Sequence, residues 1–394
     1  MACARTGCRR SEQRGDAGRP ARLLQRVINV ISGGRLSLPV CPQQPTYRCA
    51  ALSDVKGQFR KRRPCAKIKN YSSAGNGARE RRAVDAYIFR ELLTEVGPSR
   101  CNGLEISLIS LKIHHKTTYR FNKPVALGPH RLMLRPRENR DLRLISSHVT
   151  VTPESMVTWA HDVFGNAVAT ATFQTMADNL VIDSVMELQL DAVAWPVFSI
   201  AASAIVYPFR YSDDEWIDLG ALTIQQYPDP TGRLRDWARA FVRGQSTDTL
   251  SLLKDLSAGV TGWIRYQSRD DEGTQSPTQT LDRGWGSCRD FAVLFADAVR
   301  SLGFGARIVS GYLYNPDQQS VGSSDAGSTH AWAEVFVPGA GWITFDPTNR
   351  SVGGFNLIPV AVVRDIRQAI PVSGNFVGMT DAFAGMSVEV LVTS

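Results

Sequence analysis

Hydrophobic and polar residues alternate along much of the chain between residues 105 and 195. The clearest run places apolar residues of one parity among mostly polar neighbours: Leu180, Ile182, Met186, Leu188 and Leu190. Such alternation is typical of a β-strand with one buried face. Further strands are expected at 109–113, 117–121, 130–136 and 142–151, with a hairpin of 156–160 and 167–173. Many short strands without a helical period predict an antiparallel β-sandwich over 105–195.

The spacing of apolar residues changes after a linker at 196–229 that is rich in proline and aromatic residues. Apolar positions then recur every three or four residues, which predicts helices at 234–242, 250–264 and 288–302. Strands are expected at 306–313, 330–337 and 342–345, and one more at 386–392 in a turn-rich tail, 351–394. The sequence therefore predicts an α+β domain over 230–350, with helices packed on an antiparallel sheet.

Residues 1–104 differ from the rest in composition. The first hundred residues hold 21 Lys/Arg against 7 Asp/Glu, whereas the remainder holds 24 against 30. Arg, Gly, Pro and Ser dominate this segment, and it contains little apolar periodicity, which predicts a basic, disordered extension. No Cys-x-x-Cys pair supports a zinc-binding arm there. A further hypothesis is that the native start of translation lies near Glu105, where the composition changes.

The net charge of the folded part indicates which partners it can bind, and its cysteine content indicates the cellular compartment. Because the folded part is mildly acidic, nucleic acid is not expected to be its partner. Cys288 is the only cysteine after residue 101, so the folded part cannot form an internal disulfide. This favours a reducing, cytoplasmic environment. No apolar run is long enough to span a membrane, and none reads as a secretory signal.

Five histidines are scattered through the predicted sandwich: His114, His115, His130, His148 and His161. Their spacing does not fit a metal site, and hydrogen-bonded or surface positions are the simpler interpretation. We therefore expect no metal or other cofactor.

Cys288 is the first candidate for chemistry. It falls in the first turn of the predicted helix 288–302, with Ser287 as its N-cap and Asp290 in the position of a capping-box acid. The positive end of a helix dipole favours a thiolate over a thiol. The small residues Gly284, Gly286 and Ser287 would let a substrate backbone approach the sulfur, and the Cys288 N–H could stabilise an oxyanion.

His330 and Asp346 are the second and third candidates. If strands 330–337 and 342–345 form a hairpin that turns near Pro338 or Gly339, then opposite residues have numbers that sum to 676–678. His330 then lies across from Asp346 or its near neighbour, with both side chains on one face. A carboxylate beside an imidazole keeps it basic and fixes its tautomer, as a general base for a thiol requires. The three residues therefore predict a nucleophilic triad.

Each residue also has a structural interpretation. A cysteine at a helix start is often a small buried residue, and His330 or Asp346-Pro347 could be a strand end and a turn. The tryptophans Trp285, Trp332 and Trp342 fit core packing best, although Trp285 could line an acyl pocket. As residues that could contact the substrate or its oxyanion, the sequence singles out Trp285, Ser287 and Trp332.

Three motifs carry a resemblance to a known family. They are Gly-Ser-Cys288-Arg-Asp-Phe-Ala, Thr-His330-Ala-Trp-Ala-Glu-Val-Phe-Val-Pro and Gly-Trp-Ile-Thr-Phe-Asp346-Pro-Thr-Asn. Together they resemble the transglutaminase-like superfamily, in its bacterial cysteine-peptidase-like branch. The upstream Thr117-Thr-Tyr-Arg-Phe, Leu134-Arg-Pro136 and Asp162-Val-Phe-Gly-Asn166, and Arg364-Asp365 in the tail, strengthen the resemblance. It covers about 106–394, and residues 1–105 have no counterpart.

This resemblance implies a papain-like core in which a helix bearing the cysteine packs on an antiparallel sheet. It also implies a Cys-His-Asp triad of Cys288, His330 and Asp346, which forms a thioester with the acyl group of a peptide or protein amide. Hydrolysis ranks above transfer to an amine, because nothing resembles the calcium sites of the animal cross-linking enzymes. Two alternatives stay open: acyl transfer to an amine, and a non-catalytic binding or scaffold protein. The oligomeric state is also open.

Overall fold

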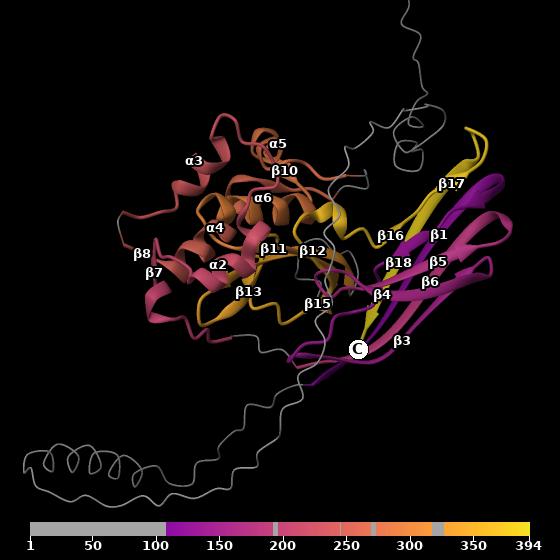
Figure 1. Cartoon of the computed structure of the whole chain (residues 1–394), viewed down its shortest axis with the longest axis horizontal. Coiled ribbons are helices and arrows are strands. Elements are labelled where there is room, and N and C mark those ends of the chain that lie inside the picture. Colours follow the sequence, from indigo (N-terminus) through magenta and orange to yellow (C-terminus); the bar gives the residue numbers. More distant parts are fainter. Residues whose placement is uncertain (1–107, 192–195, 245, 269–272, 317–326) are drawn as a thin grey trace, which may run out of the picture. The chain divides into compact units, whose positions relative to one another are not determined.

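The computed structural model describes residues 108–191, 196–244, 246–268, 273–316 and 327–394 (Figure 1). The predicted extension at 1–104 lies outside the described residues. The chain from residue 109 onward is a mixture of strands and helices, with the long strands first and the helices in the middle.

Two antiparallel sheets form the first part of the described chain, as the alternation predicted. Their main strands are β1 (Ile109–Leu127), β2 (His130–Leu132), β3 (Leu142–Thr152), β4 (Ser155–His161), β5 (Ala167–Phe173) and β6 (Met176–Leu190). Two short strands from the C-terminal segment, β16 (Val372–Ser373) and β17 (Phe376–Val377), join them, so that one sheet has the order β17-β1-β6-β3 and the other β16-β2-β5-β4. Side chains from both sheets meet in one buried cluster that includes Val125, Leu132, Ala169, Leu180 and Ile182. This shared cluster makes the pair of sheets a sandwich.

The C-terminal segment contains more strands than the single one predicted for a turn-rich tail. It supplies β14 (Ser351–Val352), β15 (Leu357–Val363), β16 (Val372–Ser373), β17 (Phe376–Val377) and β18 (Phe383–Thr393). The predicted strand is present as β18, which pairs antiparallel with β1 along Lys112–Phe121. The two-residue strands β14, β16 and β17 are too short to produce an alternation that the sequence could reveal.

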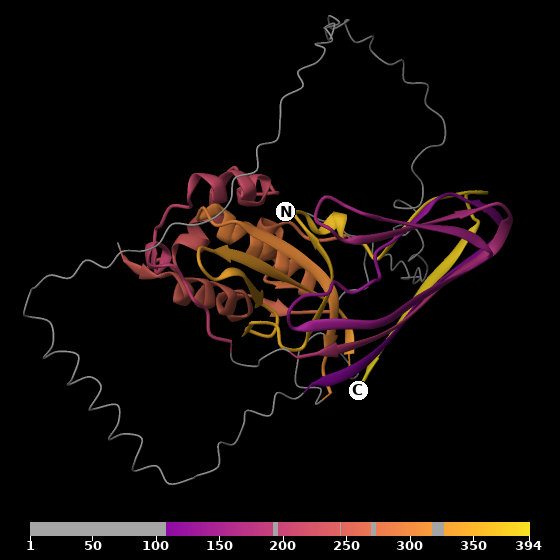
Figure 2. The ribbon, with the colours of Figure 1, turned by 60° about the horizontal axis from the view of Figure 1, so that its bottom comes forward.

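The second half of the chain contains the predicted helices and strands. The helices are α3 (Arg233–Arg239), α4 (Thr249–Trp263), with Asp248 as its N-cap, and α6 (Cys288–Ser301). The strands β11 (Ala306–Tyr314), β12 (Gly327–Val337) and β13 (Gly341–Asp346) lie in a sheet of order β14-β13-β12-β11-β15. Figures 1 and 2 show α6 alongside β11 and β12. The predicted α+β arrangement is confirmed.

Two short helices escaped the sequence analysis. They are α2 (Asp213–Leu219), inside the predicted linker, and α5 (Pro277–Arg283). Each has a capping box, Ser212 with Glu215 and Ser276 with Gln279. Two turns are too few for a helical period to stand out, so the caps were their only signal. The linker is also tied to the core, because Asp297 of α6 accepts the backbone N–H groups of Gln226 and Tyr227.

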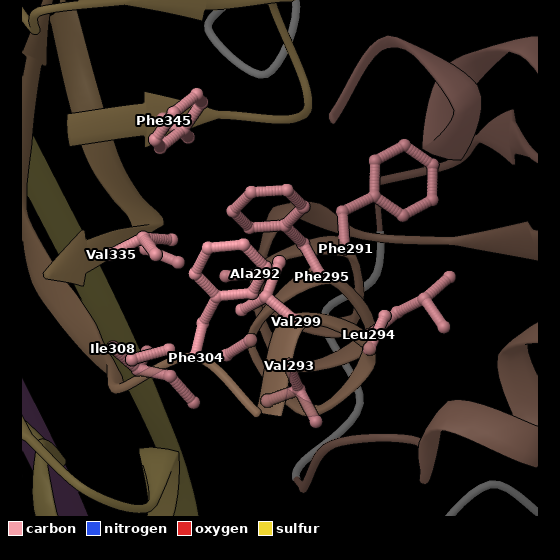
Figure 3. Close-up of a cluster of buried hydrophobic side chains, with 14 of the residues drawn as sticks. Phe291, Ala292, Val293, Leu294, Phe295, Val299, Phe304, Ile308, Val335 and Phe345 are labelled. Carbon is pink, nitrogen blue, oxygen red and sulfur yellow. The ribbon is translucent and has the colours of Figure 1, made fainter. Parts of the chain in front are cut away.

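The buried face of α6 holds the second half of the chain together. Phe291, Phe295 and Val299 are fully buried, and Figure 3 shows Phe295 on the side of the helix that faces the sheet residues Val335 and Phe345. The rings of Phe295 and Phe345 have centroids 5.3 Å apart. Each fully buried aromatic side chain contributes about 1.5–3 kcal/mol to folding. This packing fixes the first turn of α6, and with it Cys288, beside β12.

The sandwich contacts the sheet of the second half of the chain, and one of these contacts joins β1 to β11. His115 Nδ1 lies 2.9 Å from the hydroxyl oxygen of Tyr312 on β11, and its Nε2 lies 3.2 Å from Thr117 Oγ1. Further along, the side-chain amide of Asn166 bonds both the N–H and the carbonyl of Val362 on β15. His114 and His130 are also hydrogen-bonded, to Asp183 and to the Gly128 carbonyl. For these three histidines the hydrogen-bonded interpretation is confirmed.

Candidate active site

Cys288 is the first residue of α6, and the residues just before it are held in place by Asp290. The Asp290 carboxylate accepts the backbone N–H of Ser287 at 2.8 Å and the Ser287 hydroxyl at 2.9 Å. It also accepts the backbone N–H of Gln275 at 2.7 Å. The capping-box position that the sequence predicted for Asp290 is confirmed. These bonds fix the entry of the chain into α6 and so the direction in which the Cys288 side chain leaves the helix.

The predicted hairpin of β12 and β13 is present. Ala333 pairs with Phe345 and Val337 with Gly341, so opposite residues have numbers that sum to 678. Asp346 lies one residue beyond the last pair, diagonal to His330, and both are even-numbered and share a face. His330 Nε2 is 2.9 Å from Asp346 Oδ2, with both residues buried. The spacing argument thus placed the imidazole and the carboxylate together correctly.

Asp346 is held by the turn that follows it. Its Oδ1 accepts the Thr348 N–H at 2.9 Å, and its Oδ2 accepts the Asn349 side-chain amide at 2.8 Å. Burial alone would raise the pKa of Asp346, but His330 and these donors outweigh burial and lower it. Asp346 is therefore a carboxylate. Asn349 is a positioning residue that the sequence analysis did not single out, although it closes the motif containing Asp346.

The Cys288 thiol lies close enough to His330 for the two side chains to shift each other's pKa. Nε2 of His330 bonds Asp346, and its buried Nδ1 has no hydrogen-bond partner among the described residues. Burial alone would raise the pKa of Cys288, but hydrogen bonding and charge from His330, with Arg289 and the Ala331 N–H, lower it. Burial alone would lower the pKa of His330, but Asp346 and Cys288 raise it to about 10. Both shifts favour the charged forms, a thiolate beside an imidazolium.

Of the three residues singled out for substrate contact, the structure leaves only Trp285 available. Trp332 is 1% exposed and stacks on the His330 ring with centroids 6.2 Å apart, so it supports the imidazole and does not reach a substrate. Ser287 is 4% exposed and its hydroxyl donates to Asp290. Trp285 is half-buried, with Arg283 over its ring, and its role in an acyl pocket stays a prediction.

Tyr266 is a residue of the site that sequence reasoning missed. It lies on β9 (Arg265–Tyr266), a two-residue strand that pairs in parallel with β10 (Trp285–Gly286) just before Cys288. Its hydroxyl is close enough to Cys288 and Asp346 for their charges to act on it. No local motif marks Tyr266, because only the pairing of two short strands that are distant in sequence brings it to the thiol.

Within the described ranges, no three His, Cys, Asp or Glu side chains come together in a way that could hold a metal ion. In the same ranges, no helix is both long enough and apolar enough to cross a membrane.

Comparison with known proteins defines the class to which this fold and site belong. Residues 235–347 match the transglutaminase-like superfamily, and residues 111–189 match the bacterial transglutaminase-like N-terminal region. The chain belongs to the transglutaminase-like superfamily, in the form that carries this N-terminal region. The first match holds the candidate residues, and the second corresponds to the strands of the sandwich.

Particular relatives share most of this length. A Mycobacterium leprae protein, "Uncharacterized protein ML0607", is 23% identical over 288 residues, which are 71% of this chain and 98% of the relative. A Mycobacterium tuberculosis protein, "Uncharacterized protein Rv2569c", is 24% identical over 277 residues, 67% of this chain and 86% of the relative. The crystal structure of a "Putative Cysteine Protease" from Cytophaga hutchinsonii superposes with a TM-score of 0.56 at 18% identity, covering 73% of this chain and 91% of that one. That likeness shows a shared fold.

Proposed function

We propose that the protein is a cysteine-dependent hydrolase of amide bonds in peptides or proteins. Cys288 is its nucleophile, His330 its general acid and base, and Asp346 the group that orients and charges His330. The observation that carries the proposal is that buried Asp346 bonds Nε2 of His330 at 2.9 Å, while His330 lies close enough to Cys288 to lower the pKa of the thiol. A core that only needed to pack would gain nothing from a buried histidine and a buried carboxylate beside a half-buried thiol.

The reaction follows from the positions of these groups. The Cys288 sulfur attacks the amide carbonyl carbon, a C–S bond forms, and the carbonyl oxygen takes the negative charge. The Cys288 N–H lies in the first turn of α6, where no helical carbonyl is available to it, and it donates to that oxygen. His330 then gives its proton to the leaving nitrogen as the C–N bond breaks. A thioester remains, and neutral His330 removes a proton from the water that hydrolyses it.

The same thioester could pass its acyl group to an amine, which is the second candidate. The match of residues 235–347 to the transglutaminase-like superfamily favours it, because a transglutaminase transfers an acyl group to an amine. Hydrolysis is the first candidate, because a solved structure that shares this fold is described as a "Putative Cysteine Protease". Cys288 is the only cysteine after residue 101, so this part of the chain gains no internal disulfide from an oxidising compartment, and we propose a cytoplasmic location on that ground.

The test uses the full chain and a library of peptides with a fluorogenic amide at the acyl position. We expect a subset of the peptides to be hydrolysed, and Cys288→Ala to be inactive on every one of them. A labelled primary amine is added in parallel with the preferred peptides. Free acid as the product supports hydrolysis, whereas labelled amide as the main product supports acyl transfer. No cleavage and no label, with a correctly folded protein, would contradict both.

A further inference from the structure

Three helices enclose a pocket that the proposed reaction does not use. The pocket has a volume of about 260 Å³ and is lined by Arg233 and Trp237 of α3, Trp263 and Ile264 at the end of α4, and Leu281 of α5. Pockets that hold a whole small molecule are larger, about 300–1,000 Å³. This pocket therefore has the size for a single large side chain.

Trp263 leaves one wall of the pocket open to solvent. It is 72% exposed, whereas Leu256 and Val260 of the same helix are fully buried. An indole left in water forgoes the burial of about 150–250 Å² that a large aromatic side chain usually gains. A ligand in the pocket would cover part of this ring, so Trp263 is placed to stabilise a bound apolar group.

Arg233 does not give the pocket an unpaired charge. Its Nε lies 3.0 Å from Oδ1 of Asp282, and its Nη2 donates to the Leu281 carbonyl at 3.4 Å. The guanidinium is thus held against α5 and is neutralised by a carboxylate. The pocket therefore suits a neutral group better than an anion.

Trp237 brings a hydrogen-bond donor to the pocket wall. Its indole N–H is buried and has no acceptor among the described residues, and its ring packs edge to face on Phe241 with centroids 5.2 Å apart. Buried donors are nearly always paired, so an unpaired donor in a pocket wall indicates a ligand that carries an acceptor. A peptide meets both requirements, because its side chain can be apolar and its backbone carbonyls accept hydrogen bonds. A pure hydrocarbon meets only the first.

The pocket lies close to the proposed active site along the chain. Ile264 is two residues before Tyr266, which is the strand partner of Gly286 in the pairing of β9 with β10. Gly286 is in turn two residues before Cys288. Four strand residues and one step between strands span about 20 Å at most. An extended peptide covers that distance in about six residues, so one substrate can reach both the pocket and the thiol.

We propose that this pocket binds one large apolar side chain of the peptide substrate, within about six residues of the amide that is cleaved. This inference rests on the proposed function and adds a substrate class to it, a peptide with a neutral, apolar anchor such as leucine or phenylalanine. The pocket takes no part in the chemistry, and no bond forms or breaks there. It selects substrates at a distance from Cys288.

The first test does not depend on catalysis. N-acetyl-leucinamide carries one apolar side chain between two amides, and N-acetyl-glycinamide carries the amides alone. Each is titrated into the full chain while the indole N–H signals of the eight tryptophans are followed by two-dimensional NMR. The variants Trp237→Phe and Trp263→Ala assign the two signals of interest. We expect the leucine compound to shift the Trp237 signal downfield, as a hydrogen bond forms, and to move that of Trp263, while the glycine compound leaves both in place.

The same titration in Trp263→Ala shows whether the pocket binds the compound. The matched control is Trp216→Ala, because Trp216 is a 53% exposed tryptophan of α2 that does not line the pocket. The shift of the Trp237 signal should be lost in Trp263→Ala and kept in Trp216→Ala. Circular dichroism spectra and thermal midpoints are recorded for both variants.

The second test joins the pocket to hydrolysis. In the peptide that the parent hydrolyses best, each residue within six positions of the cleaved amide is replaced by alanine in turn. We expect replacement of one apolar residue to raise KM on the order of tenfold with kcat unchanged, since a remote contact binds the ground state and the transition state alike. In Trp263→Ala the same replacement should change KM much less, because the contact is already lost. Trp216→Ala should keep the parent's tenfold difference.

The outcomes separate the pocket from the proposed function. Unmoved indole signals, or equal shifts with the two compounds, would overturn the apolar ligand class. A KM difference that is as large in Trp263→Ala as in the parent would overturn the role of the pocket as a substrate subsite. If the parent hydrolyses no peptide while N-acetyl-leucinamide still shifts the Trp237 signal, the proposed function fails and the ligand class is upheld.

Discussion

Two buried histidines, His115 and His330, show how differently the two halves of this molecule use the same side chain. Each is 2% exposed and hydrogen-bonded: His115 to Tyr312 and Thr117, and His330 to Asp346. Burial, and then the neighbouring His114, lowers the pKa of His115 to about 4. The pKa of His330 is raised to about 10, because Asp346 and Cys288 outweigh burial. His115 is therefore neutral at pH 7, and His330 is charged.

The difference lies in the partners and not in the depth of burial. His115 faces two hydroxyls, from Tyr312 and Thr117, which can bond a neutral imidazole but do not compensate a charge. His330 lies between a carboxylate and a thiol, both of which become negative. A buried histidine with neutral partners joins two sheets, whereas one between two acids holds a proton ready for transfer. This contrast is the physical reason for assigning chemistry to one half of the chain only.

The contrast is tested most strongly by removing each imidazole. His330→Ala should reduce amide hydrolysis by about 10²–10⁴-fold, the usual contribution of a general acid and base. It should also slow Cys288 alkylation at pH 7 on the order of 30-fold, since a free thiol with pKa near 8.5 is only a few per cent thiolate. His115→Ala, measured in the same alkylation assay, should match the parent. Comparable losses in the two variants would show that the contrast is wrong.

Asp346→Asn removes the charge beside His330 and keeps the shape of the side chain. The imidazole then loses the main group that raises its pKa, and each unit of that fall costs about a tenfold change in the protonation equilibrium. We expect hydrolysis to drop on the order of 10²-fold and the pH dependence of Cys288 alkylation to move toward that of an ordinary thiol. An alkylation profile that does not move would mean that Asp346 does not charge His330.

The pH dependence of the free energy of unfolding should reveal the protonation state of His115. Because the folded-state pKa of His115, about 4, lies below the unfolded value of 6.5, the unfolded chain takes up the proton first. The contribution of His115 is complete above pH 6.5 and is lost as the pH falls toward 4, at about 1.4 kcal/mol per pH unit. In urea titrations from pH 7 to pH 5, His115→Gln should therefore show a shallower loss than the parent. Parallel curves would contradict a neutral, buried His115.

Much of this arrangement could be predicted from the sequence, because the spacing of apolar residues within a short segment indicates whether it forms a strand or a helix. Alternation gave β6, three-to-four spacing gave α6, and the number of residues between His330 and Asp346 fixed the hairpin that joins them. Each of these features depends only on residues close together in the chain. The prediction that Cys288 starts a helix also needed only its neighbours Ser287 and Asp290.

Other features could not be predicted, since they depend on contacts between distant segments. The tail residues join sheets that begin more than two hundred residues earlier, as with β18 and β1, and no local pattern specifies the partner. Tyr266 reaches the site only through a parallel pair of two-residue strands. Trp332 appeared able to contact a substrate, and its burial beneath His330 depends on tertiary packing that a single strand does not encode.

The charge state of Cys288 is the central claim, and its alkylation rate as a function of pH tests it most directly. The full chain is treated with iodoacetamide from pH 5.5 to pH 9, and the peptide that contains Cys288 is quantified against the same peptide from the urea-unfolded chain. The account predicts a rate in the native protein that stays nearly constant from pH 6 to pH 8.5, while the unfolded thiol slows about tenfold per pH unit below its pKa of about 8.5. A native rate that falls in parallel with the unfolded one would contradict the account.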